Sequence, residues 1–136
     1  MNLFKLATQS KWYVGFLQPV VYEVIRTKEL TRLLDVGTGY GNLPTMLLEK
    51  LPGLKITATD NDIIKINQAI RTSTNMNIDY RHDSNALQMF DAESYDIITF
   101  CSILFLLDEQ TRQTLLRNAI RVLKPGGKII VLTPTG

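Results

Sequence analysis

Residues 33–41 of the chain read LLDVGTGYG, and this stretch decides the fold. The run Arg32–Val36 is short and largely apolar, which is typical of a strand buried inside a parallel sheet. Glycines follow it at positions 37, 39 and 41, where they allow the backbone to turn sharply and to approach a ligand closely. Residues 42–51 then carry leucines at helical spacing, with Pro44 tolerated in the first turn. The stretch therefore predicts a strand, a glycine bend and a helix.

The same alternation continues along the rest of the chain. Apolar runs predict further strands at 54–59, 78–82, 95–100 and 128–132. Amphipathic stretches between them predict helices at 62–73 and 108–123, and the glycine and proline at 124–127 predict a turn. Strands that alternate with helices predict an α/β, doubly wound, Rossmann-like parallel sheet of about five strands with helices on both faces.

The helical segments carry expectations about individual residues. Residues 1–30 are predicted to be helical, and Pro19 predicts a break between two helices. The aromatic residues at 12, 13 and 16 are interpreted either as plain packing or as a lid over a ligand bound to the core domain, which is expected at 31–136. In the later helices we expect these apolar side chains to face inward: Ile63, Ile66, Ala69, Ile70, Leu115, Leu116, Ala119, Ile120 and Leu123.

Polar side chains stand at the end of each of the first three predicted strands, or directly after it. They are Asp35, Asp60, Asn61, Asp83, Ser84 and Asn85. Because ligands of parallel sheets bind beyond the carboxyl ends of the strands, these side chains should project into one crevice beside the first strand. A helix cap or a turn is the alternative role for each aspartate taken alone.

The register of the glycines helps to define the ligand. A dinucleotide site requires G-x-G-x-x-G, whereas here Gly41 comes one residue early and Asn42 stands in the dinucleotide position. The carboxylate of Asp35 would repel a pyrophosphate, but it would attract a cationic sulfonium and an ammonium group. Asp60 lies 23 residues after Gly37, a separation that suits a carboxylate accepting hydrogen bonds from both ribose hydroxyls.

Five segments together resemble the motifs of class I S-adenosylmethionine-dependent methyltransferases, in the same order. They are LLDVGTGYG (33–41), TATDND (57–62), HDSNAL (82–87), YDIITFCSILFLL (95–107) and RVLKPGGKIIVL (121–132). The resemblance implies that S-adenosyl-L-methionine is the cofactor and S-adenosyl-L-homocysteine the product. It implies that Asp35, Gly37 and Gly39 lie at the methionine end, Asp60 at the ribose, and Asp83 with Ser84 or Asn85 at the adenine. The cofactor-binding set that it implies also includes Thr38, Gly41, Asn61 and Cys101.

The chain departs from this family in two places. Many members that act on small molecules carry two histidines in the loop after the fourth strand, where this chain has Phe105 and Leu106. No histidine base is therefore expected there, and these two residues either line an apolar acceptor pocket or belong to the core. The family sheet has two further strands after the fifth, so we expect this chain to be truncated. The strand at 128–132 would then be an exposed edge that could pair with a second copy.

Composition narrows the remaining choices. The formal net charge of +2 gives no basic footprint for nucleic acid, so no nucleic-acid partner is expected. The single cysteine excludes an internal disulfide and a cysteine-rich metal site, and it favours a cytoplasmic setting. We interpret Cys101 as a buried thiol and not a nucleophile, because Phe100 precedes it where cytosine methyltransferases have proline. No apolar stretch reaches the roughly 20 residues of a transmembrane helix.

The sequence thus favours methyl transfer from S-adenosylmethionine to a small-molecule or lipid- or quinone-like acceptor. No general base and no metal ligand can be nominated. Three alternatives stay open: a domain that binds the cofactor without catalysis, a nicotinamide-dependent oxidoreductase, and a nucleic-acid methyltransferase. The early third glycine speaks against the second alternative, and the near-neutral charge speaks against the third.

Overall fold

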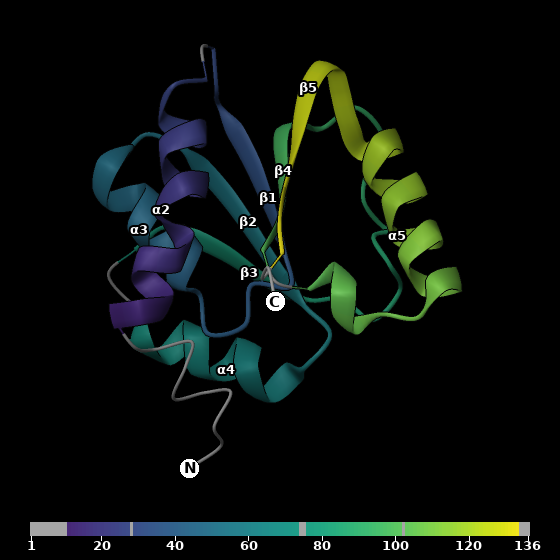
Figure 1. The fold of residues 1–136 in the computed structure, drawn as a ribbon, viewed down its shortest axis with the longest axis horizontal. Coiled ribbons are helices and arrows are strands. Elements are labelled where there is room, and N and C mark those ends of the chain that lie inside the picture. The colour runs from purple at the N-terminus through teal and green to yellow at the C-terminus, as the bar shows by residue number, and fades with distance from the viewer. Residues whose placement is uncertain (1–10, 28, 74–75, 102, 134–136) are drawn as a thin grey trace.

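The fold is built on a five-stranded parallel sheet (Figure 1). The structure, a computed structural model, describes residues 11–27, 29–73, 76–101 and 103–133. The strands are β1 (Arg32–Val36), β2 (Lys55–Asp60), β3 (Ile78–His82), β4 (Tyr95–Cys101) and β5 (Leu123–Leu132). Their order in the sheet is β3-β2-β1-β4-β5, which confirms the predicted doubly wound α/β fold.

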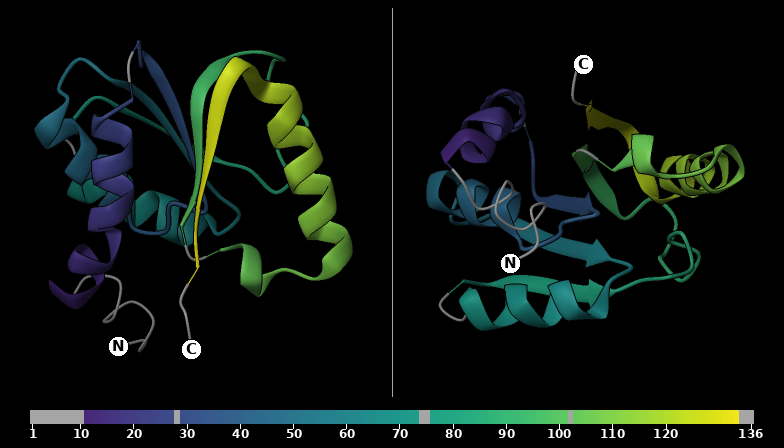
Figure 2. Two further views of the ribbon diagram at one scale, coloured as in Figure 1. Left: turned by 45° about the horizontal axis from the view of Figure 1, so that its top comes forward. Right: turned by 60° about the horizontal axis from the view of Figure 1, so that its bottom comes forward.

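Helices cover both faces of this sheet (Figure 2). They are α2 (Lys11–Ile25), α3 (Asn42–Lys50), α4 (Ile63–Thr72) and α5 (Glu109–Val122), with a short 3-10 helix η1 (Leu104–Leu106) before α5. Helices α2 and α3 pack on one face and α5 on the other, whereas α4 lies beside β3 (Figure 2). Two apolar clusters result, because alternate residues of each buried strand point to opposite faces. Leu33 of β1 belongs to the cluster under α2 and α3, and Leu34 belongs to the cluster under α5.

The ends of α4 and α5 lie where the sequence signals place them. Asp62 caps α4 by accepting hydrogen bonds from the backbone N–H groups of Ile64 and Lys65, at 3.0 and 3.4 Å. Asp108 caps α5 by accepting one from Thr111 at 2.8 Å. Side-chain oxygens at this position satisfy backbone donors that have no partner inside the helix.

The predicted inward face of these helices is too wide. Ile66 and Ala69 of α4 are buried, but Ile63 and Ile70 are exposed because α4 lies over the edge of the sheet and packs mainly on β2 and β3. In α5 the buried stripe runs along Leu115, Ala119 and Val122, and Ile120 is 66% exposed. A helix that contacts a sheet along one narrow stripe leaves the apolar residues beside that stripe in solvent.

The predicted break at Pro19 is wrong, because α2 continues through it. Pro19 is exposed, and the helix loses one backbone hydrogen bond there because proline has no N–H group. Leu17, Val20, Val21 and Val24 are buried in the cluster that α2 shares with β1 and α3. The predicted helix over residues 1–10 lies outside the described residues, as do the side chains of residues 11–15.

Strand β5 begins earlier than predicted, and residues 124–127 lie within it. Tyr95 pairs with Leu123 and Ile97 with Lys128, so one residue of β4 stands opposite four residues of β5. The expected turn is therefore an irregular bulge in a continuous strand, and Lys124 Nζ lies 3.4 Å from Asp96 Oδ1 across it. Extra residues in one strand are accommodated in this way without ending the pairing.

Candidate functional site

The glycine bend after β1 is held at the carboxyl end of β2. The backbone N–H groups of Gly37 and Thr38 donate to the carbonyl oxygen of Thr59, at 2.9 and 2.8 Å. Gly37 has φ +75°, and a Cβ atom on it would collide with the side chain of Ile103. Any larger residue at position 37 would therefore be strained in its backbone and would also collide with Ile103.

Asp60, the last residue of β2, connects this bend to the start of α4. One carboxylate oxygen accepts the backbone N–H of Gly39 at 2.8 Å, and the other accepts that of Asp62 at 2.9 Å. Each oxygen keeps a second lone pair, so the carboxylate can still accept hydrogen bonds from a ligand hydroxyl. Asp60 is buried to all but 9% of its surface, and it lines a pocket.

Asp83, directly after β3, serves a turn as well as the pocket. Its backbone N–H donates to the carbonyl oxygen of Asp60 at 2.9 Å, which joins the ends of β2 and β3. Its two carboxylate oxygens accept the backbone N–H groups of Asn85 and Leu87, at 3.1 and 2.9 Å. The turn-forming role, which the sequence left open for a single aspartate, is thus observed for Asp83.

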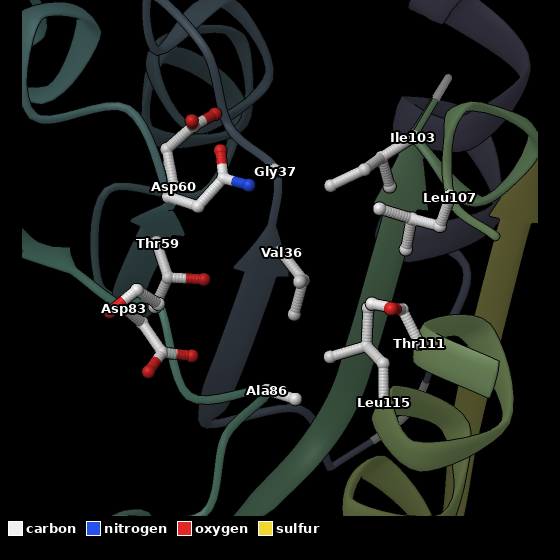
Figure 3. Close-up of a pocket in the computed structure, with 12 residues that line it drawn as sticks. Val36, Gly37, Thr59, Asp60, Asp83, Ala86, Ile103, Leu107, Thr111 and Leu115 are labelled. Carbon is white, nitrogen blue, oxygen red and sulfur yellow. The ribbon is translucent and has the colours of Figure 1, made fainter.

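The pocket lies between the ends of β1, β2 and β3 and the segment that follows β4 (Figure 3). Its volume is about 100 Å³. One wall is mainly polar and is formed by Thr59, Asp60, Asn61, Asp83 and Ser84. The opposite wall holds Ile103, Leu107, Thr111 and Leu115, with Val36, Gly37 and Ala86 between the walls. A site with one polar and one apolar wall suits a flat ring that carries hydrogen-bonding groups at one edge.

Asp35 lies at the end of β1 on the face of the sheet that α2 and α3 cover, and only 2% of it is exposed. Its Oδ1 accepts the hydroxyl of Thr99 on β4 at 2.7 Å. Burial raises the pKa of this carboxyl from 3.8 to about 6, against the lowering effect of the Thr99 hydrogen bond. The nearby Thr38 hydroxyl also acts to lower this pKa, but its oxygen is buried and forms no hydrogen bond of acceptable geometry. A buried carboxylate beside a polar atom without a partner is a place where a cationic ligand group would be stabilised.

Cys101 ends β4 in the apolar cluster below the bend and does not line the pocket. Burial, reinforced by the charge of Asp35, raises the pKa of its thiol. The thiol therefore stays protonated at neutral pH, as expected of an inert buried cysteine.

The structure brings together part of the predicted site. Gly37, Asp60, Asn61, Asp83 and Ser84 line the pocket. The other predicted residues do not line the pocket: Thr38, Gly39 and Gly41 belong to the bend, Asp35 and Cys101 lie beneath it, and Asn85 lies in the turn after β3. Among the described residues, no group of three histidine, cysteine, aspartate or glutamate side chains is arranged to hold a metal ion.

Sequence reasoning missed the apolar wall. Ile103 and Leu107 flank the pair that the sequence singled out in this loop, Phe105 and Leu106. The side chain of Phe105 lies outside the described part of the chain, and Leu106 is 61% exposed. Thr111 and Leu115 are four residues apart near the start of a helix whose inward face was predicted, and this spacing could have revealed them.

The fold and the site together define a Rossmann-like α/β domain. Its pocket lies beyond the carboxyl ends of the strands and beside β1, where the order of the sheet reverses. Carboxylates at the ends of β1 and β2 and a glycine bend are grouped at this point.

Comparison with known proteins identifies the family. Residues 33–127 match the family model described as a methyltransferase domain, and the chain belongs to this family. The cofactor of this class I family is S-adenosylmethionine. The nicotinamide-dependent alternative is thereby removed.

Individual relatives agree with this assignment. The chain is 29% identical over 106 residues to a malonyl-[acyl-carrier protein] O-methyltransferase of Haemophilus ducreyi, and the matched region covers 76% of the chain and 40% of the relative. It is 28% identical over 105 residues to a ubiquinone/menaquinone biosynthesis C-methyltransferase of Desulfotalea psychrophila, and that match covers 76% of the chain and 42% of the relative. A solved structure from Pyrococcus horikoshii shares the fold with a TM-score of 0.80 at 20% identity, covering 96% of this chain and 65% of that one.

The chain spans about two fifths of the length of these curated relatives. No helix among the described residues is long and apolar enough to cross a membrane.

Proposed function

We propose that this chain binds S-adenosylmethionine at the bend and pocket described above. Asp60 would hold the ribose, and Asp83 with Ser84 or Asn85 would hold the adenine, with Asn61 beside them. Asp35, Thr38 and the glycines at 37, 39 and 41 would surround the methionine end, close to Cys101. The observation that carries this proposal is the hydrogen bond from Gly39 to Asp60, which fixes the glycine bend against the carboxylate that would hold the ribose.

The size of the pocket supports a division of the ligand along this site. A volume of about 100 Å³ is below the roughly 300–1,000 Å³ typical of pockets for whole cofactors and drug-sized ligands. The enclosed part therefore suits one flat ring, and the rest of the ligand would extend along the open side of the glycine bend. Gly39 has no atom within 4 Å of a Cβ position, which leaves room there.

For the reaction we propose methyl transfer to a small-molecule or lipid- or quinone-like acceptor. When bound, S-adenosylmethionine supplies an activated methyl group to the acceptor nucleophile. The names of the relatives support this choice, because they mention ubiquinone and menaquinone biosynthesis and a malonyl acyl-carrier protein. Leu106, in the loop after β4, is 61% exposed and lies outside the pocket that we assign to the ring of the cofactor. Holding acceptor and methyl group in near-attack geometry can lower the barrier by up to ~7–11 kcal/mol without a dedicated base.

The first test is a calorimetric titration of the chain with S-adenosylhomocysteine, which needs no acceptor. We expect saturable binding with one site per chain, because the site is built from one chain. Titration with NAD under the same conditions should give no binding, because Gly41 comes one residue too early for a pyrophosphate. Absence of binding heat for S-adenosylhomocysteine from a folded chain would overturn the proposal.

A domain that binds the cofactor without catalysis remains the second candidate, since the chain spans only part of its relatives. Turnover of a quinone-like acceptor by the chain, followed as methyl incorporation, would decide against it. We also propose that helix α2 serves packing and is not a lid over cofactor or substrate, because Leu17, Val20 and Val24 are buried in the core. We propose that the protein works in the cytoplasm, where its single thiol stays reduced.

We further propose that the chain self-associates through β5. The edge at β3 carries Asp79, Arg81 and His82, whereas residues 129–132 of β5 are uncharged and Val131 is 47% exposed. Charged side chains protect an edge strand from pairing, and residues 129–132 of β5 lack them. Light scattering at high concentration should therefore give about twice the monomer mass of 15.4 kDa.

Val131→Lys should return this chain to the monomer, because it places a charge on the edge. Tyr22→Lys on α2, at a residue that is 76% exposed, is the matched control and should leave the dimer intact. A mass of 15.4 kDa for the unaltered chain at every concentration would refute the pairing.

A further inference from the structure

Tyr80 lies in the middle of β3, opposite Ala58 of β2, and its ring reaches across to the start of α3. The sequence reasoning did not single it out. Its side chain is half-buried on the same face as Ile78, the face that packs against the helices.

The ring of Tyr80 closes against Gly41, the residue at the N-cap of α3. Gly41 has φ +81°, and a Cβ atom on it would collide with the Tyr80 hydroxyl and would lie 3.1 Å from Cζ. The backbone N–H of Gly41 donates to the carbonyl oxygen of Thr38 at 3.0 Å, so Gly41 closes the glycine bend. The Tyr80 hydroxyl therefore limits how far this end of the bend can move toward β3.

The hydroxyl is itself held from the other side. Ser73 Oγ, at the end of α4, lies within hydrogen-bond distance of the Tyr80 hydroxyl oxygen at 3.3 Å and of the Ala69 carbonyl oxygen at 2.5 Å. Burial, followed by the charge of Asp35, raises the pKa of the Tyr80 phenol, so it remains a neutral hydroxyl at physiological pH. One side chain thus connects the end of α4, the edge strand and the last residue of the bend.

We propose that Tyr80 is a positioning residue whose hydroxyl sets the position of the glycine bend for ligand binding. The inference rests on the proposed cofactor site, because the bend matters to function only if a ligand binds along it. Tyr80 acts through Gly41 and does not line the pocket.

A double-mutant cycle of Tyr80→Phe and Gly41→Ala tests this contact. Tyr80→Phe alone should weaken S-adenosylhomocysteine binding by about 2–10-fold, because the hydroxyl that limits the movement of the bend is removed. Gly41→Ala should weaken it more, but the fold loss should shrink at least about threefold in the Tyr80→Phe background, where the colliding hydroxyl is gone. The same cycle is measured on the urea unfolding midpoint, which requires no ligand.

Matched variants separate positioning from general destabilisation. Tyr22→Phe removes a hydroxyl from a largely exposed tyrosine and should leave affinity unchanged. Ser73→Ala frees the Tyr80 hydroxyl without removing it, so its effect on affinity should be smaller than that of Tyr80→Phe. If the unaltered chain binds S-adenosylhomocysteine and the two substitutions add independently in affinity and in unfolding, the role of Tyr80 is overturned. If the unaltered chain does not bind, the proposed function fails while the unfolding cycle still tests the contact.

Discussion

Asp35→Asn is expected to stabilise the chain at pH 7.5 by ~1–3 kcal/mol and to weaken its binding of S-adenosylmethionine. Burial holds the pKa of Asp35 at about 6, above its ordinary 3.8, so ionising this carboxyl in the folded chain costs free energy. Asparagine keeps the acceptor for Thr99 and carries no charge. The Thr38 oxygen, which has no hydrogen-bond partner, is available to accept from the new amide.

The gain should depend on pH with a definite sign. Because the folded pKa exceeds the unfolded pKa, the stabilising effect of the protonated Asp35 is complete below pH ~3.8 and is lost as the pH rises through about 6. The amide side chain of Asp35→Asn does not ionise, so this variant does not lose stability in this way. The difference in the free energy of urea unfolding between the variant and the unaltered chain should be small at pH 4 and reach its full size at pH 7.5. Asp79→Asn, at an exposed carboxylate paired with Arg81, is the control and should show no such gain. An equal effect of Asp35→Asn at both pH values would contradict the explanation.

Binding should respond in the opposite direction. The ionised Asp35 attracts a positively charged ligand. Asp35→Asn should therefore weaken the binding of S-adenosylmethionine severalfold more than the binding of S-adenosylhomocysteine, whose sulfur is uncharged. Calorimetry with both ligands measures this difference. Equal losses for the two ligands would refute the electrostatic role of Asp35 and would leave it as a structural residue.

The sequence predicted the sheet well because its strands are short apolar runs bounded by glycine, proline or aspartate. It also predicted Asp60 and Asp83 at one pocket, because the end of a parallel strand has a fixed place in the fold. The burial of Asp35 beneath the bend was not foreseen. The hydroxyl that its carboxylate accepts there belongs to Thr99 of β4, which lies 64 residues away along the chain.

Failures arose where the outcome depends on neighbours distant in sequence. Ile63 and Ile120 satisfy helical spacing, yet the sheet does not extend far enough to cover them. The apolar wall formed by Ile103 and Leu107 exists only because the segment after β4 folds back over Val36. The contact of Tyr80 with Gly41 likewise joins two separate segments, and no local sequence pattern in either segment predicts it.

Asp60→Ala is expected to lower cofactor affinity by ~10–150-fold, because charge-assisted hydrogen bonds to the ribose would be worth about 1.5–3 kcal/mol. The structure adds a second reason, since this carboxylate also accepts the N–H of Gly39 and so holds the bend. The cofactor affinity of Asp60→Asn should lie between that of the unaltered chain and that of Asp60→Ala. An amide has only one oxygen, so one of the two backbone N–H donors that Asp60 now accepts would face an N–H group instead.

Asp62→Ala provides the matched control two residues away. Asp62 caps α4 and does not line the pocket, so its removal should cost about 1 kcal/mol of stability and leave affinity near that of the unaltered chain. Thermal unfolding and titration with S-adenosylhomocysteine on the three variants separate the two carboxylates. Unchanged affinity in Asp60→Ala, or an equally large loss in Asp62→Ala, would show that the aspartate at the end of β2 supports the loop alone and that the ribose is held elsewhere.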